Sequence, residues 1–290
     1  MTWQDLLPST ASWNGRIYGR FRLIAGAYLF VHFLHLAPWA SEVFSSEGLL
    51  PDARLSPLVR LFPNVLAVAD SPTFVTAFVL AAGCAALLFA VGAADRLCAI
   101  YMFYVLACLY GRNPLIANPS LPYIGWLLLA HATLPPLPMG VGLWPMQSPD
   151  WKFSRPLQTA AWFLLAAGYS FSGYTKLVSP SWLDGTAMAR VLESPLARPG
   201  LARQVLLALP PDVIRLMSYG ALSLELSFLP LALIPRIRPW LWLGLLGMHL
   251  ALIGLIDFAD LSFGMVIFHL FVADPAWLPR SISSGRVRAT

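Results

Sequence analysis

The sequence carries little charge. Asp, Glu, Lys and Arg make up only 11% of its 290 residues, whereas 58% of the residues are hydrophobic. Soluble domains contain about 25% charged residues, so this composition excludes an ordinary soluble domain. A chain this apolar is expected to be all-α, a polytopic integral membrane protein whose helical bundle lies in the lipid bilayer.

Cysteine is scarce as well. Cys84, Cys98 and Cys108 all fall within apolar segments, and no CxxC pair occurs. This usage excludes a disulfide framework and gives no indication of thiol redox chemistry. The expected role of all three is that of small hydrophobic packing residues.

Motifs for metals, phosphates and nucleic acids are missing too. His32 and His35 share one helical face, but a metal site normally needs a further converging ligand, and no H-E-x-x-H motif is present. A G-x-x-x-x-G-K-[ST] loop is also absent. The net charge of +5 comes from arginines that flank apolar segments, which indicates membrane topology. No metal and no nucleic-acid partner are therefore expected.

Eight segments of the chain approach the roughly 20 apolar residues that a transmembrane helix requires. They lie near residues 22–40, 73–94, 97–111, 121–138, 157–178, 214–234, 239–256 and 258–273. The third and the last are short, so eight transmembrane helices are predicted to within about one. No soluble segment separates them, and residues 1–290 are expected to form a single membrane domain.

The arginines predict how these helices are oriented. Residues 1–21 lack an apolar core followed by a cleavage site, so the first apolar segment is expected to be the insertion signal. Arg16, Arg20 and Arg22 precede it, and positive charge favours the cytoplasmic side. The protein is expected in the cell membrane or an inner membrane. With eight spans, both of its termini are expected on the cytoplasmic side. The segment 157–178 then ends on the extracytoplasmic side.

Two segments expected on that outer side are too long to be simple turns. Within residues 41–72, the mixture of apolar residues and arginines at positions 54–62 predicts a short helix lying in the membrane interface. Residues 179–212 contain prolines at positions 180, 195, 199, 210 and 211, which predict a series of short pieces.

Lysine is the rarest basic residue of the chain. Lys152 and Lys176 are the only two, and the other 17 of the 19 basic residues are arginines. Lys176 ends an apolar run, where burial penalises its charged form. A lysine that releases its proton there can act as a base. A lysine at a helix end can equally extend to the lipid headgroups, so both interpretations stay open.

Two further polar residues lie inside apolar segments. Glu225 must be neutral, paired or solvated there, and Lys176 is the lysine that can pair with it. A Lys176–Glu225 pair is expected either to take part in the chemistry of a site or to stabilise the fold. His249 is expected to be either a proton carrier or a packed, hydrogen-bonded residue.

Several short sequence motifs and single residues occur in a defined order along the chain. They are Gly48-Leu49-Leu50-Pro51, Arg112-Asn113-Pro114, Gly173-Tyr174-Thr175-Lys176-Leu177, Trp182, Gly185-Thr186-Ala187, Glu225, His249, Phe263-Gly264-Met265 and Asp274-Pro275-Ala276-Trp277. In this order they resemble the horizontally transferred transmembrane (HTTM) domain, which is the membrane domain of the vitamin K-dependent gamma-carboxylase family. The resemblance covers about residues 16–277.

The resemblance implies a reaction. In the carboxylases the lysine that matches Lys176 deprotonates vitamin K hydroquinone. The oxygenation that follows yields a base strong enough to remove a glutamate γ-proton, after which carbon dioxide adds. Lys176 would inherit the role of base, with vitamin K hydroquinone or another quinol as cofactor. The chain departs from the family at Pro119, which stands where the carboxylases have a catalytic histidine and has no titratable group.

The predicted site combines these residues. Its catalytic residues are Lys176, Glu225 and His249, and its cofactor-binding residues are Tyr169, Ser172 and Trp182. Tyr169 and Ser172 precede Lys176 by seven and four residues and so share its helical face. Three functions are compatible with this site: a quinol-using membrane enzyme, a non-catalytic membrane partner in the maturation or export of a secreted peptide, and a transporter with buried charges.

Overall fold

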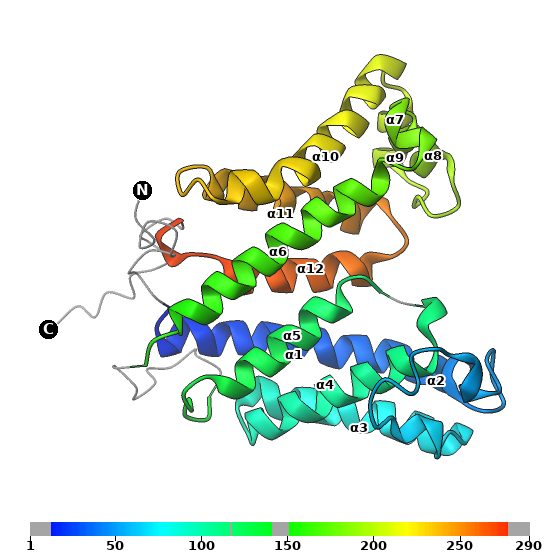
Figure 1. Cartoon of the computed structure of the whole chain (residues 1–290), viewed down its shortest axis with the longest axis vertical. Coiled ribbons are helices and arrows are strands. Elements are labelled where there is room, and N and C mark those ends of the chain that lie inside the picture. Colours follow the sequence, from blue (N-terminus) through cyan, green and yellow to red (C-terminus); the bar gives the residue numbers. More distant parts are fainter. Residues whose placement is uncertain (1–12, 117, 141–150, 278–290) are drawn as a thin grey trace, which may run out of the picture. The chain divides into compact units, whose positions relative to one another are not determined.

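Helices make up the regular structure of the chain. The computed structural model describes residues 13–116, 118–140 and 151–277 (Figure 1). Within these ranges it contains helices, loops and two isolated β-bridges, and no strand. The all-α class is therefore confirmed for the described part of the chain. The two ends of the chain, to which the expectation of cytoplasmic termini applies, lie outside the described residues.

The described residues form α-helices α1 to α12. They are α1 (Gly15–Leu36), α2 (Ala40–Phe44), α3 (Pro72–Val91), α4 (Asp95–Arg112), α5 (Leu121–Thr133), α6 (Arg155–Lys176), α7 (Pro180–Leu183), α8 (Ala187–Glu193), α9 (Leu201–Leu207), α10 (Pro211–Ala232), α11 (Arg238–Leu255) and α12 (Ala259–Val272). Short 3-10 turns complete them: η2 (Ala37–Trp39), η3 (Ala53–Leu55), η4 (Val65–Ala67), η5 (Pro114–Ile116) and η6 (Pro275–Trp277).

Each of the eight apolar segments forms a helix, namely α1, α3, α4, α5, α6, α10, α11 and α12. Among the described residues, three helical stretches are long and apolar enough to cross a membrane: Gly15–Phe44, Pro72–Val91 and Arg238–Leu255. A fourth is added if α9 and α10, which meet at a bend of 107°, form one broken span. Such helices are typical of membrane proteins, and the number of eight spans stays a prediction.

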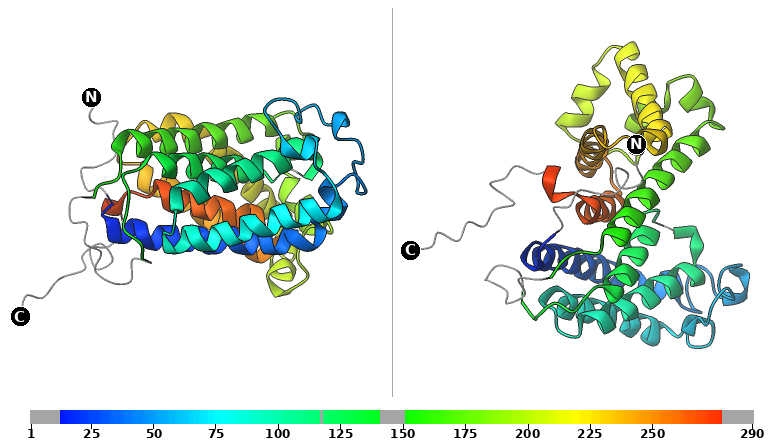
Figure 2. Two further views of the ribbon diagram at one scale, coloured as in Figure 1. Left: turned by 90° about the horizontal axis from the view of Figure 1, so that it is seen from below. Right: turned by 60° about the vertical axis from the view of Figure 1, so that its left-hand side comes forward.

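The described helices group into two compact units, Trp13–Ser154 and the residues from Arg155 onward. In the N-terminal unit α1 packs on α3, α3 on α4 and α4 on α5 (Figures 1 and 2). Gly26 lets α1 and α3 approach closely, because a Cβ there would lie 2.6 Å from the Cβ of Ala90. Small residues permit such close helix pairs in membranes. The expectation of a single domain stays a prediction.

Local signals set the limits of these helices. The side chain of Asn14 accepts a hydrogen bond from the backbone N–H of Ile17 at 2.9 Å and so caps α1. Ser71 caps α3, whose first residue is Pro72, a residue suited to a helix start. Gly92 ends α3 with a φ of 82°, a left-handed conformation that glycine adopts without strain.

Two arginines of the N-terminal unit are fully buried, and each is held by a carboxylate. Arg22 Nη1 donates to Asp95 Oδ2 at 2.6 Å, and its Nη2 donates to the carbonyl of Gly140 at 2.8 Å. Arg112 Nη2 donates to Asp70 Oδ2 at 3.2 Å. A buried guanidinium is stable only with such partners, so the two arginines tie loops to helix ends.

The conformation of the loop between α2 and α3 differs from the one predicted from the sequence. In place of the predicted interfacial helix, the 3-10 turn η3 is followed by a turn at residues 57–60 and a bend at residues 61–62. The hydroxyl of Ser56 donates to the carbonyl of Gly111 at 2.6 Å and so fixes the loop to the end of α4. Pro57 and Pro63 also disfavour helical conformation in the residues that precede them. The predicted helix is therefore wrong.

In the C-terminal unit α6 packs on α10 and α12, and α11 packs on α12. Residues 179–212 divide into the short helices α7, α8 and α9, as their prolines predict. Two contacts join this segment to the N-terminal half of α10. Tyr219 donates its hydroxyl proton to the carbonyl of Leu183 at 3.1 Å, and the Met188 N–H donates to Ser218 Oγ at 3.0 Å. The segment is thus an ordered part of this unit.

Candidate functional site

Lys176 ends α6, and three side chains surround its ammonium group. Nζ donates to Ser172 Oγ at 2.8 Å, one turn earlier on α6, and to Glu225 Oε2 on α10. The centroid of the Trp182 ring on α7 lies 5.1 Å from Nζ, within cation–π range. The Lys176 side chain is 21% exposed and that of Glu225 is 8% exposed. The ammonium thus has a counterion, an acceptor and an aromatic face, and part of the lysine stays accessible.

Gly173 explains how α6 and α10 come close enough for this pairing. A Cβ at position 173 would lie 2.7 Å from the backbone nitrogen of Leu226 and 3.1 Å from the Cβ of Glu225. Any larger residue would therefore push the two helices apart. Gly173 belongs to the site although it carries no chemical group.

A second group of polar side chains lies further along α6, around Tyr169. Its Oη lies 2.8 Å from His249 Nε2 on α11 and 3.3 Å from His269 Nε2 on α12. His249 Nδ1 lies 3.3 Å from Ser262 Oγ, and His269 Nδ1 lies 2.8 Å from the carbonyl oxygen of Met265. All four polar side chains are buried, so they link α6, α11 and α12 in the interior of the unit.

For neutral imidazoles, one arrangement of protons satisfies these four contacts. The Met265 carbonyl can only accept, so His269 Nδ1 carries the proton and Nε2 accepts from Tyr169. The single phenolic proton of Tyr169 is then used, so His249 Nε2–H donates to the phenol oxygen. His249 Nδ1 is left to accept from Ser262. The hydrogen bonds of this cluster therefore all run in one direction.

The structure divides the six predicted site residues between the two groups. Lys176, Glu225, Ser172 and Trp182 meet at the end of α6, and Tyr169 and His249 meet in the second group. Tyr169 precedes Lys176 by seven residues, or about 10 Å along the helix. The roles of the six residues stay predictions.

Sequence reasoning did not place His269 and Ser262 with Tyr169. Their partners come from helices far apart in the chain, and no local pattern signals such contacts. Across the described ranges, no group of three or more His, Cys, Asp or Glu side chains is arranged to hold a metal ion.

The segment at Pro119 forms the turn that precedes α5. Asn118 Oδ1 accepts from the backbone N–H of Ser120 at 2.9 Å and from its hydroxyl at 2.8 Å. Pro119 itself is exposed. The turn lies in the N-terminal unit and offers no titratable group at position 119.

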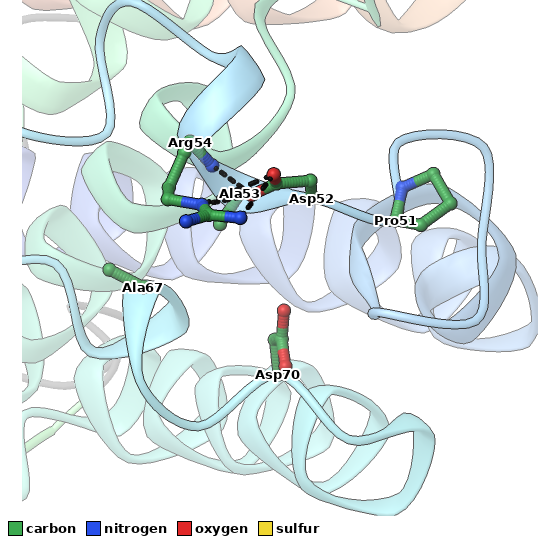
Figure 3. Close-up of a pocket in the computed structure, with 6 residues that line it drawn as sticks. All are labelled: Pro51, Asp52, Ala53, Arg54, Ala67 and Asp70. Carbon is green, nitrogen blue, oxygen red and sulfur yellow. Dashed lines mark hydrogen bonds and ion pairs between the residues drawn. The ribbon is translucent and has the colours of Figure 1, made fainter.

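An open pocket of about 430 Å³ lies in the loop between α2 and α3 (Figure 3). Arg54 pairs with Asp52 on one wall, and the carboxylate of Asp70 points toward them from the other. Hydrogen bonds from Arg54 lower the pKa of the Asp52 carboxyl below its ordinary value. The remaining lining residues are Pro51, Ala53 and Ala67, and none of the predicted site residues is among them.

Comparisons of the chain with protein-family models, with curated proteins and with solved structures found no match.

Proposed function

We propose that the chain is an integral membrane protein of the carboxylase-like HTTM group, with eight transmembrane helices and both termini in the cytoplasm. The formation of a helix by each of the eight apolar segments supports this. On this topology the end of α6 faces the extracytoplasmic side. The observation that carries the proposal is the placement of Lys176 Nζ between Glu225, Ser172 and the ring of Trp182.

In this proposal Lys176 deprotonates a reduced quinone, either vitamin K hydroquinone or another quinol. A bound quinol supplies an acidic ring hydroxyl and a ring that can be oxidised. Glu225 already accepts a hydrogen bond from Nζ, so it is placed to take the ammonium proton and leave a neutral amine. That amine then accepts the proton of the ring hydroxyl.

The residues present fit a quinol in two further respects. Ser172 holds Nζ at 2.8 Å and so fixes the direction of its lone pair once the proton has left. Trp182 offers a flat aromatic surface 5.1 Å from Nζ, and aromatic rings favour stacking on such surfaces. The site therefore combines a base, an acceptor for its proton and an aromatic wall.

Lys176→Arg tests the base. Arginine keeps the positive charge and can pair with Glu225, but it does not lose its proton at accessible pH. The variant is expected to insert and fold while its quinol-dependent oxidation, epoxidation or carboxylation falls by about 100-fold or more. Lys152→Arg serves as the matched control and should keep its activity. Wild-type activity in Lys176→Arg would show that Lys176 is not the base.

A non-catalytic role is the second candidate, and the completeness of the ion pair favours it. Glu225, Ser172 and Trp182 satisfy the ammonium as they would satisfy a structural lysine. The chain would then be a membrane partner in the maturation or export of a secreted peptide. Native mass spectrometry in mild detergent separates the two candidates, because a bound quinone supports the enzyme and a bound peptide without quinone supports the partner.

A further inference from the structure

Helix α10 contains a proline, Pro230, five residues after Glu225. In a regular α-helix the N–H of residue 230 donates to the carbonyl of Leu226, and that of Leu229 donates to the carbonyl of Glu225. Pro230 has no N–H, and its ring presses against the carbonyl four residues earlier. The hydrogen-bond ladder of α10 is therefore interrupted at the turn that carries the counterion of Lys176.

The hydroxyl of Ser170 on α6 reaches this interruption. Its Oγ lies 3.1 Å from the carbonyl oxygens of both Glu225 and Leu226. It also accepts a hydrogen bond from the backbone N–H of Leu229 at 2.9 Å. A serine hydroxyl has one proton and two lone pairs, so it can share its proton between these two carbonyls and accept from Leu229 at the same time.

Three residues of α6 with a spacing of three contact this part of α10. Ser170 contacts its backbone, Gly173 admits its close approach, and Lys176 pairs with its carboxylate. Such a spacing places all three on one face of α6. Glu225 takes part through its backbone carbonyl as well as its side chain, so a shift of its backbone also shifts its carboxylate.

We infer that Ser170 is a positioning residue: its hydroxyl replaces the backbone hydrogen bond that Pro230 removes from α10, and so it fixes the Glu225 carboxylate against Lys176. The inference rests on the proposed function only in treating Lys176 as the working group. The geometry on which it depends also holds for a structural ion pair.

The reactivity of Lys176 toward acetic anhydride tests the inference without any enzymatic assay. In a Lys152→Arg background Lys176 is the single lysine, and peptide mass spectrometry measures its acetylation. If Ser170→Ala releases Glu225, Lys176 Nζ loses part of the contact with its ion-pair partner and becomes more accessible to the reagent. Its acetylation rate at about pH 8 is expected to rise about fivefold, the change produced by the loss of one net hydrogen bond.

The matched control is Ser227→Ala, because the Ser227 hydroxyl donates within α10 to the carbonyl of Ser223. This variant should keep the wild-type rate. Ser170→Thr retains a hydroxyl and should also react like the wild type. An unchanged rate in a folded Ser170→Ala protein would overturn the inference.

Pro230→Ala gives the second, independent arm. Alanine restores the N–H that bonds the Leu226 carbonyl, so Ser170→Ala should have little effect on the acetylation rate in this background. If Ser170→Ala alone does not accumulate, the double variant is expected to recover. Equal effects of Ser170→Ala in both backgrounds, or no recovery, would contradict the inference. Loss of quinol chemistry alone would refute the proposed function and leave the positioning role intact.

Discussion

Glu225 and Lys176 carry opposite charges on neighbouring helices, and both are largely shielded from solvent. Removal of one partner from a fully buried pair costs about 3–5 kcal/mol. The Lys176 side chain is 21% exposed, so Glu225→Gln is expected to lower the free energy of unfolding by less, about 1–3 kcal/mol. Lys176→Met combined with Glu225→Gln should recover part of that loss. Denaturation in detergent measures it, and strictly additive losses would show that the two side chains are not coupled.

Tyr169 is the residue that joins the two histidines. Tyr169→Phe removes one hydroxyl and leaves His249 Nε2 and His269 Nε2 without this partner. A buried polar group left without a partner costs about 1–3 kcal/mol, and thermal unfolding in detergent should show a loss of this size. Tyr174→Phe is the control, because Tyr174 lies on the same helix and is 65% exposed. Equal stability of both variants would contradict the hydrogen-bonded chain described above.

At the scale of elements, Gly26 sets the distance between α1 and α3. The Cβ of an alanine at this position would lie 2.6 Å from the Ala90 Cβ and 2.9 Å from the Ala86 carbonyl oxygen. Gly26→Ala is therefore expected to destabilise the protein by about 1–3 kcal/mol. Gly247→Ala on α11, where a Cβ meets no atom within 4 Å, should be neutral or slightly stabilising. Thermal unfolding compares the two, and a stabilising Gly26→Ala would be inconsistent with this packing.

The positions of the helices could be predicted from the sequence more completely than the contacts between them. Long apolar runs with charged or proline-bearing ends locate all eight main helices, because burial in lipid demands an intact backbone ladder. The prediction of an interfacial helix at residues 54–62 is wrong, because side chains such as Asn64 fix that loop to α4. The Asn64 side chain donates to the Cys108 carbonyl at 3.0 Å. Such long-range contacts leave no local pattern in the sequence.

The candidate site shows the same division. Lys176 and Glu225 could be paired from sequence, because so few opposite charges are available inside the apolar segments. Ser170 and His269 could not be assigned, since the chain has many serines and their contacts depend on how helices pack. His249 was predicted to join Lys176, and the structure places it against Tyr169 and Ser262.

At the scale of the whole molecule, the side of the membrane is open to a direct test. With Cys84, Cys98 and Cys108 replaced by alanine, a cysteine at Arg198, in the segment between α8 and α9, should react with an impermeant thiol reagent in intact cells. A cysteine at Arg236, in the exposed turn between α10 and α11, should react only after lysis. The reverse pattern would place the Lys176 end of α6 in the cytoplasm.

Ser170 precedes Leu226 by 56 residues, so in the proposed topology α6 is synthesised and inserted before α10. Hydrocarbon offers no water to a carbonyl that lacks its partner. If both helices span the bilayer as proposed, docking onto α6 supplies the missing partner of the broken turn of α10, and the insertion of one helix is coupled to its assembly with the other during biosynthesis.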